Sequence, residues 1–265
     1  MAGRRSRRLA ITLSLIFVAL SLMLAACAVV QPVIKIGLVA PFDGRFRAVG
    51  YEAVYAARLA VRQINARGGV NGYRLELVAL DDRGEPDRAI EAAQQLIIDP
   101  QVVAVIGHFR PDSTGAAMTV YCAAGMPWVA LQSTAAGRCA PGMVVIGRGR
   151  ADQWPANRIT FAGSVPDPNT RPAAREFVAG YNAIPIDGTR AGPIALQTYE
   201  LMYLLFDAIA RAEKIDRAEI AASLASSHYQ ALSGAYAFDQ AGSLIEDRSF
   251  WYVYDRAGRP QPITP

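Results

Sequence analysis

The strongest constraint on the fold is a regular alternation of short apolar runs with longer amphipathic segments over the first half of the chain. Runs of four to eight residues indicate buried strands at Val33–Ala40, Leu75–Leu80, Val102–Ile106, Pro127–Leu131 and Val144–Gly147. Between the first four, apolar residues recur at helical spacing in Tyr51–Asn65, from Pro86 to Ile97, and in Ser113–Ala124. Strands that alternate with helices predict crossover connections and a doubly wound parallel sheet, which defines an α/β fold.

The second half of the chain follows a different pattern. The segment 148–192 is rich in proline, and only Ala173–Tyr181 within it has helical periodicity. After it, the sequence predicts a long apolar helix at Pro193–Arg211 and a shorter one at Asp216–Ala225, opened by an aspartate cap. Two short aromatic strands follow, at Tyr236–Phe238 and Phe250–Tyr254.

The N-terminus has the pattern of an export signal. Met1–Arg8 is basic, Leu9–Leu24 carries no charge, and the small residues Ala25 and Ala26 precede Cys27. This order resembles the cleavage site of bacterial lipoproteins, in which Cys27 is lipidated and becomes the first residue, anchoring the protein to a membrane. The alternative is an uncleaved signal anchor, because the apolar block is long enough to span a bilayer.

Export places the two other cysteines, Cys122 and Cys139, in a compartment that permits disulfides. We expect them to be bridged, which would close a loop of about 17 residues and stabilise the fold by roughly 3 kcal/mol. The alternative is two buried free thiols, since the sequence does not give the distance between their Cα atoms.

Charge and motif content exclude several functions. The formal charge of +4 disappears once Arg4, Arg5, Arg7 and Arg8 are removed, so the mature chain has no basic footprint for nucleic acid. The two histidines have no nucleophile and carboxylate at recognisable spacing, and no motif has the spacing of a metal or phosphate site. We therefore expect neither an enzyme nor a bound metal or cofactor. Asp81-Asp82, at a strand end, is interpreted as a turn cap.

The most specific motif of the chain is Asn65-Ala66-Arg67-Gly68-Gly69-Val70-Asn71-Gly72, which precedes the second strand. It resembles the corresponding run in one family, the branched-chain amino acid (leucine/isoleucine/valine) substrate-binding proteins of ABC transporters. The family resemblance also includes the stretches 36–41 and 105–108, the aspartates at 81 and 82, and the ending from 234 to 258.

The resemblance implies a type I periplasmic-binding fold, in which two hinged α/β lobes close on a small ligand. Here the segment that builds most of the second lobe is much shorter, so we expect one nearly complete lobe and a reduced second one. The expected organisation is a lipoprotein signal peptide at 1–26, a tether at 27–33 and the first lobe at 34–147. Residues 148–192 form a linker and remnant of the second lobe, and 193–265 complete the first.

The resemblance also implies where a ligand binds. In parallel sheets this is beyond the carboxyl ends of the strands, where helix N-termini offer unpaired amides. The expected ligand-binding residues are Ser113, Thr114, Gln132, Ser133 and Thr134. Pro111 occupies the position of the family's carboxylate-binding serine, and Asp112 adds negative charge beside it. The alternatives are that Asp112 or Ser113 is only a helix cap and that Ser133-Thr134 is only a loop.

The expected function is non-catalytic capture of a branched-chain amino acid or related small amide, for delivery to an ABC permease. The protein would be an exported lipoprotein of the cell envelope, on the periplasmic or extracytoplasmic face of a membrane. A single lobe leaves one side of a ligand in water, whereas binding sites bury most of their ligand. The alternative is therefore a single-lobe binding, sensing or interaction module without a transport role, which could be a homodimer.

Overall fold

The computed structural model describes residues 31–133, 143–148, 160–185, 190–246, 248, 250–254 and 260–263. The chain divides into two compact units, Met1–Pro32 and Val33–Pro265, and the second holds every element described. Within the described ranges, no helix combines the length and the apolarity needed to cross a membrane.

The core of the second unit is a parallel sheet of five strands in the order β2-β1-β3-β4-β5. The strands are β1 (Val33–Ala40), β2 (Arg74–Asp81), β3 (Val102–Ile106), β4 (Trp128–Ser133) and β5 (Met143–Arg148). All four pairings between neighbouring strands are parallel, as the alternation of strand and helix predicts.

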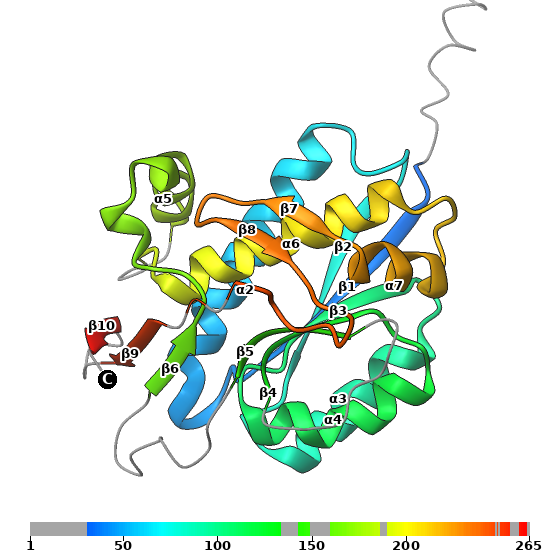
Figure 1. Ribbon diagram of the computed structural model, residues 1–265, viewed down its shortest axis with the longest axis horizontal. Helices are drawn as coiled ribbons and strands as arrows, with labels where there is room; N and C mark the ends of the chain where they lie inside the picture. The colour runs from blue at the N-terminus through cyan, green and yellow to red at the C-terminus, as the bar shows by residue number, and fades with distance from the viewer. Residues whose placement is uncertain are drawn as a thin grey trace, which may run out of the picture. The chain divides into compact units, whose positions relative to one another are not determined.

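Helices cover both faces of this sheet, so the sheet is doubly wound (Figure 1). One face carries α3 (Pro86–Ile98) and α4 (Pro111–Ala123). The other carries α2 (Arg47–Ala66), α6 (Pro193–Arg211) and α7 (Arg217–Ala225).

Alternation along β1 divides the core between the two faces. Ile36 and Leu38 are fully buried among residues of α2 and α6, whereas Val39 packs with α3 and α4. Gly37 lies so close to α3 that a Cβ atom there would come within 2.7 Å of Leu96 Cδ1. Four alanines of α2 are buried, and their small side chains let the helix approach its neighbours closely.

The middle segment packs on the same unit. It contains β6 (Thr160–Gly163), two short 3-10 turns at Pro168–Thr170 and Pro172–Ala174, and α5 (Arg175–Asn182). Helix α5 buries Phe177 and Tyr181 in a cluster with Leu59 of α2 and Leu196 of α6. The proline-rich segment therefore covers apolar surface that α2 and α6 would otherwise expose.

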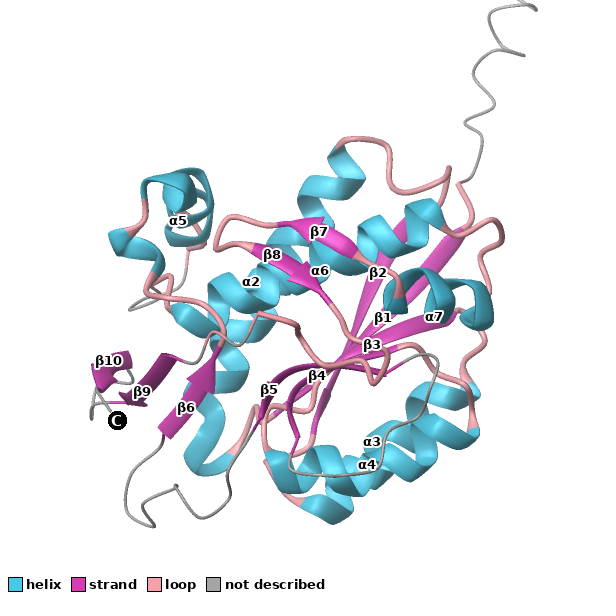
Figure 2. Ribbon diagram, in the orientation of Figure 1, coloured by secondary structure: helices cyan, strands magenta, loops and turns pink. Residues whose placement is uncertain are grey.

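The remaining strands form two small antiparallel sheets (Figure 2). Strands β7 (His228–Gln230) and β8 (Ala235–Ala237) make a hairpin. Strand β9 (Phe250–Tyr254) lies between β6 and β10 (Pro260–Ile263). The sequence predicts a strand at 250–254, but the structure pairs it with the middle segment and not with the parallel sheet.

Candidate functional site

The candidate site lies at the carboxyl ends of the parallel strands. In the order β2-β1-β3-β4-β5, chain connections leave β1 and β3 in opposite directions, which makes their carboxyl ends the switch point where ligands bind in open α/β sheets. Strand β1 ends at Ala40 and β3 at Ile106, and α4 begins five residues after β3. The sequence-predicted residues Ser113 and Thr114 lie in the first turn of α4.

The N-terminus of α4 has no side-chain cap. Its N-cap residue is Arg110, and Pro111 is the first helical residue, so the helix begins two residues earlier than predicted. Proline is favoured at this position because its fixed φ suits a helix and its missing amide proton is not needed there. Asp112 lies within the first turn, so the alternative that Asp112 or Ser113 caps the helix does not describe this structure. The first-turn amides keep their partial positive charge.

Two hydroxyl groups are buried in this first turn. Ser113 and Thr114 are both 0% exposed. The Thr114 hydroxyl donates to the main-chain oxygen of His108 at 3.3 Å. The Ser113 Oγ is buried without a hydrogen-bond partner among the described residues, which is costly for a hydroxyl unless another group satisfies it.

Charge near α4 is more balanced than the sequence indicates. The carboxylate of Asp112 lies 3.4 Å from Arg110 Nη2. The Arg110 guanidinium also lies over the ring of Phe46, 4.2 Å from its centroid, which places it beside the loop that follows β1. Burial lowers the pKa of Arg110, and Asp112 opposes that shift. Asp112 therefore has a cationic neighbour that offsets its negative charge.

Two of the residues expected on the next loop, Gln132 and Ser133, lie within a strand instead. β4 extends to Ser133, whereas the sequence predicts its end at Leu131, because main-chain pairing with β5 continues through Gln132 and Ser133. Gln132 is 0% exposed. The side chain of Ser133 and the whole of Thr134 lie outside the described residues.

A buried polar network lies beside α4 that sequence reasoning missed. His108 and Asp82 are both 0% exposed, and His108 Nδ1 lies 2.6 Å from Asp82 Oδ2. The hydroxyl of Tyr121 lies 3.4 Å from His108 Nε2, and the indole of Trp128 donates to the main-chain oxygen of Gly107. This network joins the loops after β2 and β3 to α4 and β4, so it fixes the start of α4 in place.

The aspartates at the end of β2 act as turn caps, as predicted. Asp81 Oδ1 accepts from the amides of Phe42 at 2.7 Å and Arg83 at 2.9 Å, and Asp82 Oδ1 accepts from Gly84 at 2.9 Å. Across the described part of the chain, no group of three or more acidic, histidine or cysteine residues could hold a metal ion.

Two predicted modifications depend partly on residues outside the described ranges. Cys27, the expected lipidation site, and Cys139 both lie there. Cys122, at the end of α4, is disulfide-bonded. Its pairing with Cys139 stays a prediction.

The sequence is similar to known binding proteins over part of its length. A family model described as periplasmic binding protein matches residues 33–158. An amino acid binding protein of Pseudomonas aeruginosa is 38% identical over 93 residues, which are 35% of this chain and 25% of that protein. A Leu/Ile/Val-binding protein homologue of Brucella melitensis is 34% identical over 121 residues, 46% of this chain and 30% of that protein. The matched region therefore spans less than a third of these relatives.

Solved structures extend the likeness to most of the fold. A branched-chain amino acid transporter substrate-binding protein of Streptococcus pneumoniae, in complex with isoleucine, covers 88% of this chain at 16% identity with a TM-score of 0.69, and all of that chain is matched. A substrate-binding protein of Desulfitobacterium hafniense in complex with leucine has a TM-score of 0.67 at 17% identity, over 88% of this chain and 100% of that chain. Residues 33–158 are therefore similar to the periplasmic binding protein family, and the described unit shares the α/β fold of these solved structures.

Proposed function

We propose that this chain is a solute-binding protein of the ABC-transporter type that captures a branched-chain amino acid or a related small carboxylate or amide. The ligand would bind at the carboxyl edge of the parallel sheet and pass to a permease without covalent chemistry. The similarity to a Leu/Ile/Val-binding protein homologue and to a structure in complex with isoleucine supports this proposal.

The observation that carries the proposal is the first turn of α4. A helix N-terminus without a side-chain cap attracts anions, and here it adjoins the buried hydroxyl of Ser113, which has no hydrogen-bond partner in the described part of the chain. Arg110 adds a cation at the same turn. A carboxylate would satisfy the first-turn amides, the Ser113 hydroxyl and the Arg110 guanidinium. Isoleucine, leucine and benzoate all carry one, and each is the ligand in a solved structure with a similar fold, benzoate in a solute-binding protein of R. palustris.

Calorimetric titration of the full chain with leucine, isoleucine, valine and short amides tests the proposal. We expect binding by a monomer, weakened about tenfold by Ser113→Ala, because a hydrogen bond to a charged group contributes roughly 1.5 kcal/mol or more. The matched control is Ser223→Ala, which removes another buried hydroxyl without a described partner, in α7 on the opposite face of the sheet. Equal loss in both variants, or none in Ser113→Ala, would contradict the assignment of Ser113.

The alternative function is a single-lobe sensing or interaction module. It is favoured by the complete burial of Ser113, Thr114 and Gln132, which leaves these side chains no exposed surface for a ligand in this conformation. Under this alternative, no ligand of the panel binds, and sedimentation shows a dimer. Binding by a monomer excludes it.

We also propose export and lipid anchoring through Cys27, which would place the protein in the cell envelope. The basic segment, uncharged apolar block and small residues before Cys27 support this. Metabolic labelling with palmitate should mark the wild type and not Cys27→Ala. An unlabelled wild type would exclude the anchor.

A further inference from the structure

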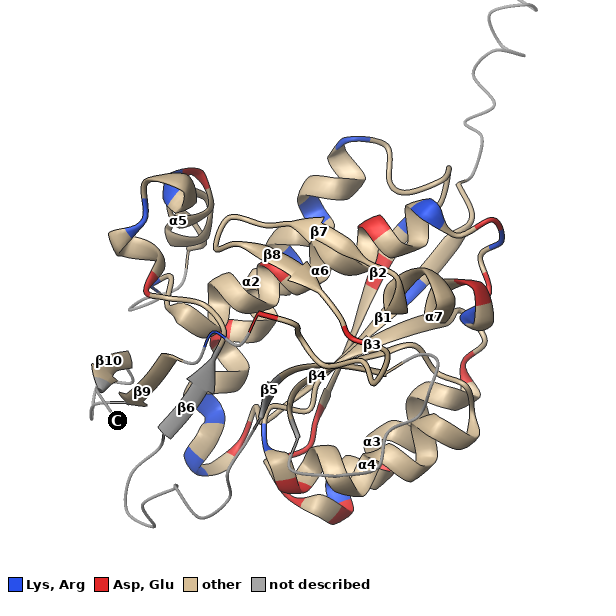
Figure 3. Cartoon of the chain, viewed as in Figure 1, with Lys and Arg blue, Asp and Glu red and all other residues tan. Residues whose placement is uncertain are grey.

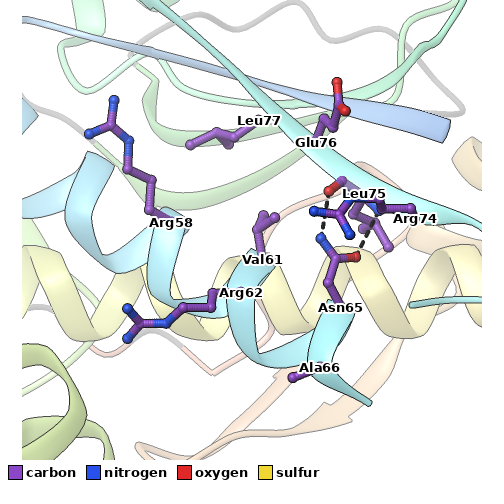
Figure 4. Close-up of a pocket in the computed structure, with 9 residues that line it drawn as sticks. All are labelled: Arg58, Val61, Arg62, Asn65, Ala66, Arg74, Leu75, Glu76 and Leu77. Atoms are coloured by element: carbon purple, nitrogen blue, oxygen red, sulfur yellow. Dashed lines mark hydrogen bonds between the residues drawn. The ribbon is translucent and has the colours of Figure 1, made fainter. Parts of the chain in front are cut away.

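Strand β2 is an edge of the parallel sheet, and a side chain of α2 already pairs with part of its free side. The carboxamide of Asn65 donates to the main-chain oxygen of Leu75 at 2.8 Å and accepts from its amide at 2.9 Å, as the dashed lines in Figure 4 show. These two bonds reproduce what a neighbouring strand would make at Leu75. The main-chain N–H and C=O groups of Leu75 therefore point to the outer side of β2, whereas those of the residues before and after it, Arg74 and Glu76, point toward β1.

The same geometry continues along the strand. Main-chain groups alternate in direction with a period of two residues, so those of Leu77 and Ala79 point to the same free edge as those of Leu75. β1 occupies only the other side of β2. In the described part of the chain, no hydrogen bond reaches this outer edge beyond Leu75 within the strand. An open edge of this kind is a template for a further strand.

A basic groove runs beside this edge, between α2 and β2, with a volume of about 610 Å³ (Figure 4). Arg58 and Arg62 project from α2, one turn apart, and Arg74 stands at the start of β2. All three are exposed, and none forms an ion pair with a described residue. Elsewhere in the unit basic and acidic positions are interspersed, as Figure 3 shows.

Arg58 and Arg62 destabilise α2 in the free chain, because like charges four residues apart on a helix repel each other. Leu75, Leu77 and Ala79 pack with the core on the α2 side of the sheet, so the side chain of Glu76 turns toward the opposite face, although Glu76 is also among the residues that line the groove. A strand added at the edge would thus meet arginines on one face and a glutamate on the other.

From this arrangement we propose that β2 binds an extended acidic segment of a partner protein as a sixth strand. Main-chain hydrogen bonds to Leu77 and Ala79 supply the pairing, and carboxylates at every second position of the segment meet Arg58 and Arg62. The intervening positions face the side of Glu76 and are uncharged. The groove thereby selects an alternating acidic and neutral sequence over a uniformly acidic one.

The probe is an eight-residue peptide of alternating glutamate and valine, acetylated, amidated and labelled for fluorescence anisotropy, titrated against the full chain to about 1 mM. We expect saturable binding that weakens with salt and is lost when lysine replaces glutamate. The double variant Arg58→Glu/Arg62→Glu should bind about tenfold more weakly. The control Arg47→Glu/Arg175→Glu makes the same change in net charge at exposed arginines outside the groove and should stay within about twofold of wild type.

Main-chain pairing has its own test. One peptide is N-methylated at every valine and another at every glutamate, so that only one of the two loses the amides that face β2. We expect one to lose binding and the other to keep it. Equal behaviour of the two peptides, absence of binding by the unmodified peptide, or equal binding by Arg58→Glu/Arg62→Glu would each overturn the proposal.

Discussion

The buried carboxylate of Glu200 provides a direct test of what holds the β7–β8 hairpin on α6. Glu200 is 2% exposed and accepts three hydrogen bonds, from the Ser233 amide at 2.7 Å, the Ser233 hydroxyl at 2.6 Å and the Tyr236 hydroxyl at 2.8 Å. Glu200→Ala leaves three buried donors without their acceptor. We expect the free energy of unfolding to fall by about 3–5 kcal/mol, the cost of breaking a buried charged network.

A double-mutant cycle with Tyr236→Phe separates this network from general packing. Tyr236→Phe alone removes one bond to a charged group and should cost about 1.5–3 kcal/mol. In the absence of Glu200 the hydroxyl of Tyr236 has lost its acceptor, so removing it should cost little. The double variant should therefore be less destabilised than the sum of the single variants by at least about 1 kcal/mol.

The measurement is urea unfolding at pH 7, followed by circular dichroism, for wild type and the three variants. Tyr229→Phe is the control, because that hydroxyl forms no hydrogen bond with a described residue and its removal should change stability by less than about 0.5 kcal/mol. Additive single effects, within about 0.5 kcal/mol, would refute the reasoning.

Three further predictions concern stability. Burial raises the pKa of the Glu200 carboxyl in the folded protein, so its contribution to the free energy of unfolding is fully present below the unfolded-state pKa and is lost as pH rises through the folded-state pKa. In unfolding titrations from pH 7 toward 4.5, wild type should gain stability relative to Glu200→Gln. A stability difference that stays constant with pH would contradict this. Gly192→Ala would bring the new Cβ atom within 2.4 Å of Glu52 Oε2 and should lower the free energy of unfolding, measured in urea, by about 1–3 kcal/mol. The control is Gly115→Ala, where the new Cβ atom would meet no atom within 4 Å. This control should be neutral or should stabilise the protein by up to about 1 kcal/mol. Cys139→Ser should lower stability by roughly 3 kcal/mol under oxidising conditions only; equal loss after reduction would exclude the predicted bridge.

The sequence predicts the regular elements well where burial is uniform. The bounds of β1, β3 and α6 agree with the apolar runs Val33–Ala40, Val102–Ile106 and Pro193–Arg211, because each lies in the core and its pattern reflects burial. The start of α2 differs, at Arg47 and not Tyr51, because a 3-10 turn capped by the Asp43 side chain leads into the helix. Such local capping leaves no periodic signal.

Contacts between loops were beyond prediction. Asp82 and His108 lie in the loops that follow the two strands flanking β1, so their 2.6 Å contact requires both loops to turn over the end of β1. Neither residue has a periodic pattern or a motif that records this approach. The hairpin at 228–237 was missed in part for another reason, since strands of three residues are too short for alternation to be recognised.

The contacts of Glu52 have a consequence for how α5 behaves. The main-chain oxygen of Glu52 accepts from the hydroxyl of Tyr181 in α5, and its carboxylate accepts from the Ala195 amide at the start of α6. One residue of α2 thus joins α5 to α6, so undocking of α5 should be detectable as faster hydrogen exchange of amides in the first turn of α6. Helix α5 is therefore joined by a hydrogen bond to the same residue of α2 that holds the start of α6.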